Sequence, residues 1–286
     1  MRCLLDARLL LPLAVVSGSL GCHLMESHEA ITQESILRAA KPSAEAVTLD
    51  IYWVRLPHTS DGSDGGLWNH VNEDRLTIDV RRRLAENGLR AGVIGSTPPD
   101  LLLRLLDPDG AGELNGDGAA ELRRTGVVVR TRQLRAGQEL PLNASPTLDE
   151  ATLLLGDGED LSERTFAAAQ GVYVVEVARA DDDRTWLSLL PTVRHGSPRL
   201  SFSHDETGVI SHGTMVRDTE AFPDLAMSSE LAPGEILLVT NLPNSGSLLG
   251  GLLHAPATDA ACERKAMLLR IADTPASQAF LPDDEG

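Results

Sequence analysis

Aromatic residues are scarce in this sequence, which has four Phe, three Trp and two Tyr among 286 residues. Its hydrophobic fraction is nevertheless 42%, so we expect a core of ordinary size built mainly from aliphatic side chains. Disorder over the whole length is not expected, because disordered chains are poorer in aliphatic residues. The length allows one or two domains.

Basic residues are also in short supply, with 25 Lys and Arg against 42 Asp and Glu and a formal net charge of −17. Nucleic-acid binding depends on Lys and Arg that displace counterions from phosphate, so no nucleic-acid partner is expected. The small cluster Arg81, Arg82 and Arg83 is typical of the solvated face of a helix.

No long apolar run stands at the N-terminus. Leu9 to Val16 is apolar, but it is well short of the roughly 20 residues that span a bilayer. Arg2 and Arg8 flank this run, and small residues such as Ser17 and Gly18 follow it. The arrangement predicts a secretory signal peptide over residues 1–21, with a buried N-terminal helix as the alternative.

Cysteine is rare as well, with three in the chain. The stretch Ser19-Leu20-Gly21-Cys22 resembles the bacterial lipoprotein signal, although Leu stands one place later than in most members. The resemblance implies that Cys22 is lipidated and becomes the mature N-terminus. Because His23 is not Asp, it also implies the periplasmic face of the outer membrane rather than the inner membrane. Several acyl chains on one Cys would anchor the protein firmly in the cell envelope.

The remaining cysteines carry no predicted chemistry. Cys3 would leave with the signal peptide, so Cys262 would stand alone and no internal disulfide could form. No spacing of a zinc site is present.

The first half of the body alternates strand and helix patterns. After a polar tether over residues 22–46, we expect a strand at Val47 to Leu56, a helix at Val71 to Glu86 and a strand at Leu89 to Ile94. A short helix follows from Thr97 to Leu106. This predicts a small strand-helix-strand α/β unit over residues 47–106, followed by an exposed Gly- and Asp-rich loop over 107–125.

The rest of the body reads as β-rich. The best hairpin candidate joins Val172 to Val177 with Trp186 to Leu190. Ser203 to Pro233 is weakly patterned and is interpreted as a long loop or an excursion. The predicted fold class is therefore α+β, with a sandwich-like β domain over 126–273 and a flexible tail over 274–286. The strand-like runs are Gly126 to Leu134, Ala151 to Leu155, Gly171 to Ala178, Arg184 to Leu190, Glu235 to Asn241 and Lys265 to Ala272.

Two acidic or histidine-bearing segments were candidates for metal binding. The loop from Asp107 to Asp109 resembles the start of a calcium loop, but Gly118 stands where the closing Glu is needed, so turn chemistry explains it better. His204, Asp205 and His212 lack a third strong ligand fixed by the sequence, and surface histidines are the better interpretation. His195 beside a glycine reads as another loop residue.

No catalytic arrangement is evident, so we expect a non-enzymatic protein without a cofactor or metal. The stretch Asn244 to Gly251 lacks the Lys of a phosphate-binding loop, and Ser247 lacks the second Gly of a nucleophile elbow. Asp50, Glu176 and Asp205 would serve an enzyme only if folding brought them together.

The last third of the chain has a further resemblance. Pro233 to Asn241, Gly246 to Gly250 and Lys265 to Ile271, preceded by Thr185 to Val193, are similar to the closing part of bacterial secretins. The Pro-rich Leu-Gly-Asp-Ile-Pro segment of that family is absent, and neither its membrane-inserting strands nor its N-terminal ring-forming domains are evident. The resemblance implies a related β fold or an envelope protein partner in an export or pilus assembly, and not a pore by itself.

Function is therefore left between two main classes. The first is a lipid-anchored, non-enzymatic envelope protein with a structural or assembly role beside a secretin-like apparatus. The alternative is a periplasmic ligand- or carbohydrate-binding module, for which Trp53, Trp68 and Trp186 would be the available aromatic platforms.

Overall fold

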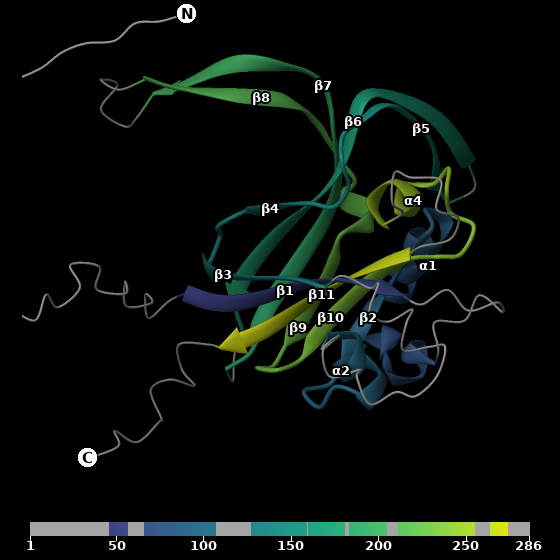
Figure 1. Cartoon of the computed structure of the whole chain (residues 1–286), viewed down its shortest axis with the longest axis vertical. Coiled ribbons are helices and arrows are strands. Elements are labelled where there is room, and N and C mark those ends of the chain that lie inside the picture. The colour runs from purple at the N-terminus through teal and green to yellow at the C-terminus, as the bar shows by residue number, and fades with distance from the viewer. Residues whose placement is uncertain are drawn as a thin grey trace, which may run out of the picture. The chain divides into compact units, whose positions relative to one another are not determined.

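The computed structural model describes residues 46–56, 66–106, 127–158, 160–180, 183–204, 211–254 and 264–273. All of these belong to one compact unit that spans Pro42–Gly286 (Figure 1). The predicted signal peptide, nearly all of the tether, the Asp107–Asp109 loop and the C-terminal tail lie outside the described residues.

Strands make up most of the described structure, which confirms the β-rich part of the predicted fold class. In chain order the elements are β1 (Ala46–Leu56), η1 (Leu67–His70), η2 (Glu73–Arg75), α1 (Ile78–Glu86), β2 (Leu89–Ile94), α2 (Asp100–Leu106), β3 (Val128–Arg135), β4 (Leu140–Asn143), β5 (Leu148–Asp157), β6 (Asp160–Arg179), β7 (Thr185–His204), β8 (Ser211–Ala221), η4 (Pro223–Leu225), β9 (Met227–Leu231), β10 (Ile236–Asn241), α4 (Leu249–His254) and β11 (Arg264–Asp273).

The first sheet has the strand order β2-β10-β11-β1-β3, with antiparallel neighbours throughout. β1 and β2 lie where the sequence predicts strands, but β10 and β11 stand between them. Strands from both ends of the body therefore build this sheet together. The helix predicted from Val71 begins later, as α1, because Thr77 caps its N-terminus by accepting a hydrogen bond from the Val80 amide at 3.4 Å.

The second sheet has the order β4-β6-β7-β8, with β9 paired to the start of β7 and β5 paired to the start of β6. The predicted hairpin is confirmed, since Val174 lies opposite Leu190 and Val177 opposite Leu187. The loop predicted over 203–233 is wrong, because β8 and β9 occupy most of it. β8 was missed because it is mainly polar, so it shows no apolar alternation.

Two apolar clusters hold the first sheet. Its one face, which includes Leu49 and Ile51, packs against the second sheet, and its other face, which includes Val54, packs under η1 and α2. β10 and the middle of β11 are buried on both faces. This explains their paired leucines, such as Leu237-Leu238, because each neighbour in the pair fills a different cluster.

The outer part of β7 leaves the second sheet together with β8 (Figure 1). The register between them shifts between His195 and Arg199, where Gly196 adopts a φ of 75°. Beyond this bulge, among the described strands, β7 pairs with β8 alone. We call residues Arg199–His204 and Ser211–Val216 the β7–β8 arm.

Candidate ligand-binding cleft

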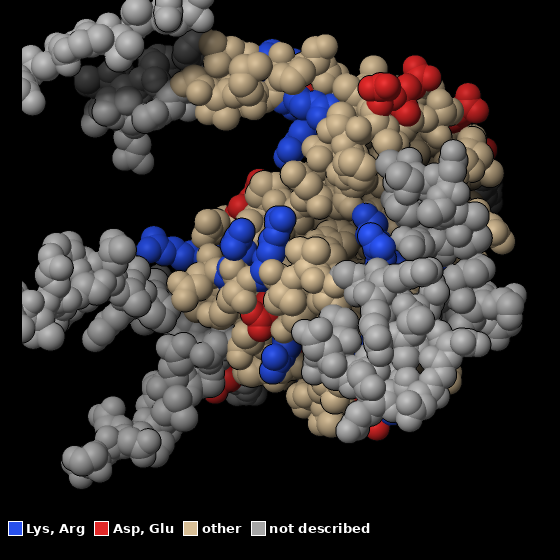
Figure 2. Space-filling view, viewed as in Figure 1, with Lys and Arg blue, Asp and Glu red and all other residues tan. Residues whose placement is uncertain are grey.

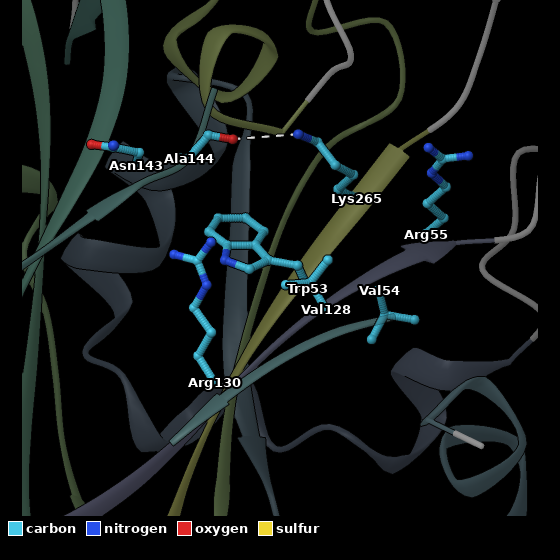
Figure 3. Close-up of a pocket in the computed structure, with 8 residues that line it drawn as sticks. All are labelled: Trp53, Val54, Arg55, Val128, Arg130, Asn143, Ala144 and Lys265. Atoms are coloured by element: carbon cyan, nitrogen blue, oxygen red, sulfur yellow. Dashed lines mark hydrogen bonds between the residues drawn. The ribbon is translucent and has the colours of Figure 1, made fainter. Parts of the chain in front are cut away.

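A cleft of about 320 Å³ opens between the edge of the first sheet and the end of β4. Figure 3 shows the side chains at this cleft, with the Trp53 indole between those of Arg130 and Lys265. Among the described residues, none that lines the cleft is acidic; the lining residues are Trp53, Val54, Arg55, Val128, Arg130, Asn143, Ala144 and Lys265.

Strand register brings the cationic residues to one face. Arg130 on β3 lies opposite Ile51 on β1, and Lys265 on β11 lies opposite Arg55 on β1. Residues directly opposite one another in an antiparallel pair project to the same side of the sheet. Because Ile51 faces the second sheet, Trp53, Arg130 and Lys265 share that side.

The cleft is strongly cationic. The Lys265 ammonium donates a hydrogen bond to the Ala144 carbonyl at 3.3 Å and lies 5.9 Å from the centre of the Trp53 ring. Burial, and secondarily the charge of Arg55, lower the pKa of Lys265 below its ordinary value. Among the described residues, no ion pair is formed by Lys265 or Arg130.

Figure 2 shows Lys and Arg side chains around a hollow in the middle of this face, whereas Asp and Glu gather near the β5–β6 hairpin. Over the described residues, acidic and basic side chains are nearly balanced. The large negative charge of the chain therefore falls mainly on other segments, and the charged side chains among the described lining residues are all basic.

A buried pair is hydrogen-bonded to the backbone of Lys265. The Tyr173 hydroxyl donates to Nε2 of His254 at 2.7 Å, and Nδ1 of His254 donates to the Lys265 carbonyl at 3.0 Å. Burial lowers the pKa of His254 to about 3 and raises the pKa of Tyr173 well above its ordinary value. Both groups are therefore neutral near pH 7, and they fix the backbone from which Lys265 projects.

Asp50 and Glu176, two of the three carboxylates considered for catalysis, are not brought together. Asp50 accepts a hydrogen bond from the Thr131 hydroxyl at 2.7 Å. Its neighbours Leu49 and Ile51 face the second sheet, so Asp50 projects from the opposite face of β1. Glu176 is exposed on the outer side of β6. Asp205 lies outside the described residues.

The histidine candidates lie on β7 and β8. His195 packs its ring 5.2 Å from that of Phe166. His204 and His212 stand near each other in the register of the β7–β8 arm, and Asp205 is not described. Within the described ranges, no group of three or more His, Cys, Asp or Glu residues could hold a metal ion. Cys22, Cys262 and the Asp107–Asp109 loop fall outside those ranges.

The glycine-rich stretch Asn244 to Gly251 serves packing. A Cβ on Gly250 would lie 2.0 Å from the Gly88 carbonyl oxygen, so α4 can approach the turn before β2 only with glycine there. Ser247 is exposed, and its carbonyl accepts a hydrogen bond from the Leu154 amide at 2.8 Å. The helix α4 was missed in this stretch because its six residues are too few to show a period.

The three tryptophans lie in different places. The Arg90 guanidinium covers the ring of Trp68 at 4.1 Å, while Trp186 is 47% exposed on the outer side of the second sheet. Trp53 is the one that lines the cleft. Sequence reasoning missed Arg130, Lys265 and His254, although a lysine at the start of an apolar strand is a usable signal.

No family model matches the chain, and no curated protein matches it. Among solved structures, the chain is similar to the InvG secretin domain β-barrel from the Salmonella SPI-1 injectisome, at 15% identity and a TM-score of 0.21. The match covers 84% of this chain and 71% of that one. A likeness at this score supports no statement about function. Within the described residues, no helix combines the length and apolar character needed to cross a membrane.

Proposed function

We propose that this chain is a lipid-anchored, non-enzymatic envelope protein with a structural or assembly role. The lipid would be carried by Cys22, and the polar residues 22–46 would connect it to the β-rich body. The observation that carries the proposal is the β7–β8 arm, which extends two strands beyond the sheet that contains the rest of β7.

The arm has the properties of a protein-binding element. Leu200 and Met215 lie opposite each other on one face of the arm and are 55% and 61% exposed. Within the described structure, the edge of β7 in the arm pairs with no strand on its other side. Exposed strand edges pair readily with strands of another chain, so an arm of this kind suits assembly with an envelope partner.

Association with a secretin-like export or pilus apparatus is the finer proposal. Its support is the resemblance of residues 233–271 to the closing part of secretins. The test is recovery of partners from cells that express the full chain, so that the identity of the partner is measured directly.

The experiment combines lipid labelling with site-specific cross-linking. Cells would be labelled with a palmitate analogue, comparing the unchanged chain with Cys22→Ala. A photo-cross-linking residue would replace Met215 in the arm or, as a control, Ile78, which is 72% exposed on α1. We expect label that requires Cys22 and a cross-linked envelope protein from position 215 only. Equal cross-linking from both positions would refute the role of the arm, and labelling of Cys22→Ala would refute the anchor.

A second candidate function is a periplasmic ligand-binding module. It is favoured by one observation, the cationic cleft around Trp53. Small-molecule sites are concave and combine apolar or aromatic walls with a few polar groups that fix orientation, and this cleft has both.

A further inference from the structure

We propose that the cleft binds a small organic carboxylate with a single ring, its carboxylate held by Lys265 and its ring against Trp53, while Arg130 adds positive charge on the other side of the indole. The inference rests on the ligand-binding function and is independent of the role of the β7–β8 arm. The charges, the walls and the size of the cleft together indicate this class of ligand.

The burial of Lys265 and its hydrogen-bond partner indicate that the ligand is an anion. Its ammonium is partly buried and has a neutral carbonyl, that of Ala144, as its hydrogen-bond acceptor. A cation withdrawn from water without an anionic partner destabilises the protein that carries it. No acidic side chain is among the described lining residues, so within the described structure this cost is uncompensated, and a bound anion would reduce it.

A second cation adds to the attraction of the cleft for an anion. Arg130 lies on the exposed edge strand β3, and its guanidinium stands beside Trp53 on the side away from Lys265 (Figure 3). Because the indole lies between the two cations, one carboxylate cannot bridge them. Lys265 therefore binds the carboxylate, and Arg130 attracts the anion from the other side of the ring.

Trp53 and the volume of the cleft indicate that the rest of the ligand is a single ring. The indole is half-buried and lines the cleft, so it offers a flat apolar wall to a ring. About 320 Å³ lies at the lower end of the range of small-molecule sites. That space suits one ring with its acid group better than a polymer segment.

The test is calorimetric titration of the purified full chain with four probes. Benzoate and glucuronate carry a carboxylate on a ring, methyl glucoside carries the ring alone, and inorganic phosphate carries charge alone. We expect benzoate or glucuronate to bind at least tenfold more tightly than methyl glucoside or phosphate.

Three variants locate the site. Lys265→Met should weaken carboxylate binding about 10- to 100-fold, as expected for loss of a charged hydrogen bond. Arg130→Gln should weaken it about three- to fivefold, through loss of a nearby exposed charge. Arg132→Gln is the matched control, because Arg132 lies on the same strand and side as Arg130, opposite Leu49, but does not line the cleft. It should leave the affinity within twofold. Arg130→Gln changes an exposed side chain, so loss of binding there cannot be ascribed to unfolding.

The outcomes separate the inference from the function on which it rests. Binding of methyl glucoside without the acids would keep the binding module and overturn the carboxylate assignment. Phosphate binding as tightly as the ring acids would overturn the ring assignment. No binding of any probe below 10 mM, or equal loss in Arg132→Gln, would overturn the site itself.

Discussion

The strand β7 passes through two environments, and their difference separates stability from interaction. In its first part, Leu187 and Leu189 are fully buried, and β6 and β9 pair with both edges of the strand. In the arm, Leu200 is largely exposed and β8 is the one described partner. A single strand thus contributes first to the core and then to the surface.

The boundary between these parts is a local backbone feature. Gly196 takes a left-handed conformation, and the register with β8 shifts within the next few residues. Pro198 in the shifted segment has no N–H to give to a neighbouring strand. A bulge of this kind bends and twists a strand, so it directs the arm away from the sheet.

The largest effect is expected in the first part of β7. Leu187→Ala should lower the free energy of unfolding by about 2–5 kcal/mol, because a fully buried leucine leaves a cavity between the two sheets. Urea unfolding followed by circular dichroism measures the change. A loss below 1 kcal/mol would show that this part is no more tightly packed than the arm.

Sequence reasoning identified the first part of β7 and missed the second. The hairpin with β6 was predictable because Val172 to Val177 and Trp186 to Leu190 are rich in residues that favour strands. The arm lacks a buried face, so its sequence carries no alternation that burial would impose.

The cleft escaped prediction for a different reason. Arg130 and Lys265 line one cleft because β1 lies between β3 and β11, and this order depends on pairing between distant parts of the chain. Each residue taken alone reads as an ordinary strand residue. The tryptophans were visible in the sequence, but which one lines a cleft was decided by the register of Trp53 with β3.

A change in pH should have an intermediate effect on the free energy of unfolding, and it acts through a group in the buried core. His254 is buried and hydrogen-bonded in its neutral form, with a folded-state pKa of about 3 against 6.5 in the unfolded chain. The unfolded state therefore binds the extra proton below pH 6.5, and stability is lost as the pH falls from 6.5 toward 3. At 1.36 kcal/mol per unit, the contribution lost between pH 7 and pH 5 is about 2 kcal/mol.

Replacement of the titrating group isolates this contribution. His254→Leu should be less stable at pH 7, because Tyr173 loses its acceptor, but its stability should fall less between pH 7 and pH 5. Tyr173→Phe is the control, since it removes one hydrogen bond and keeps the imidazole. If His254→Leu and the unchanged chain show the same pH slope, the buried histidine does not set the acid sensitivity of the core.

The smallest effect on stability is expected in the arm, and it makes the sharpest contrast with Leu187. Leu200→Ser should change the free energy of unfolding by no more than about 0.5 kcal/mol, as exposed substitutions usually do, because its side chain is already 55% exposed. The same variant should reduce cross-linking of the envelope partner from position 215, since Leu200 lies directly opposite Met215. A loss of stability approaching that of Leu187→Ala would mean that the exposed face of the arm is structural, and its apolar residues would then need no partner to explain them.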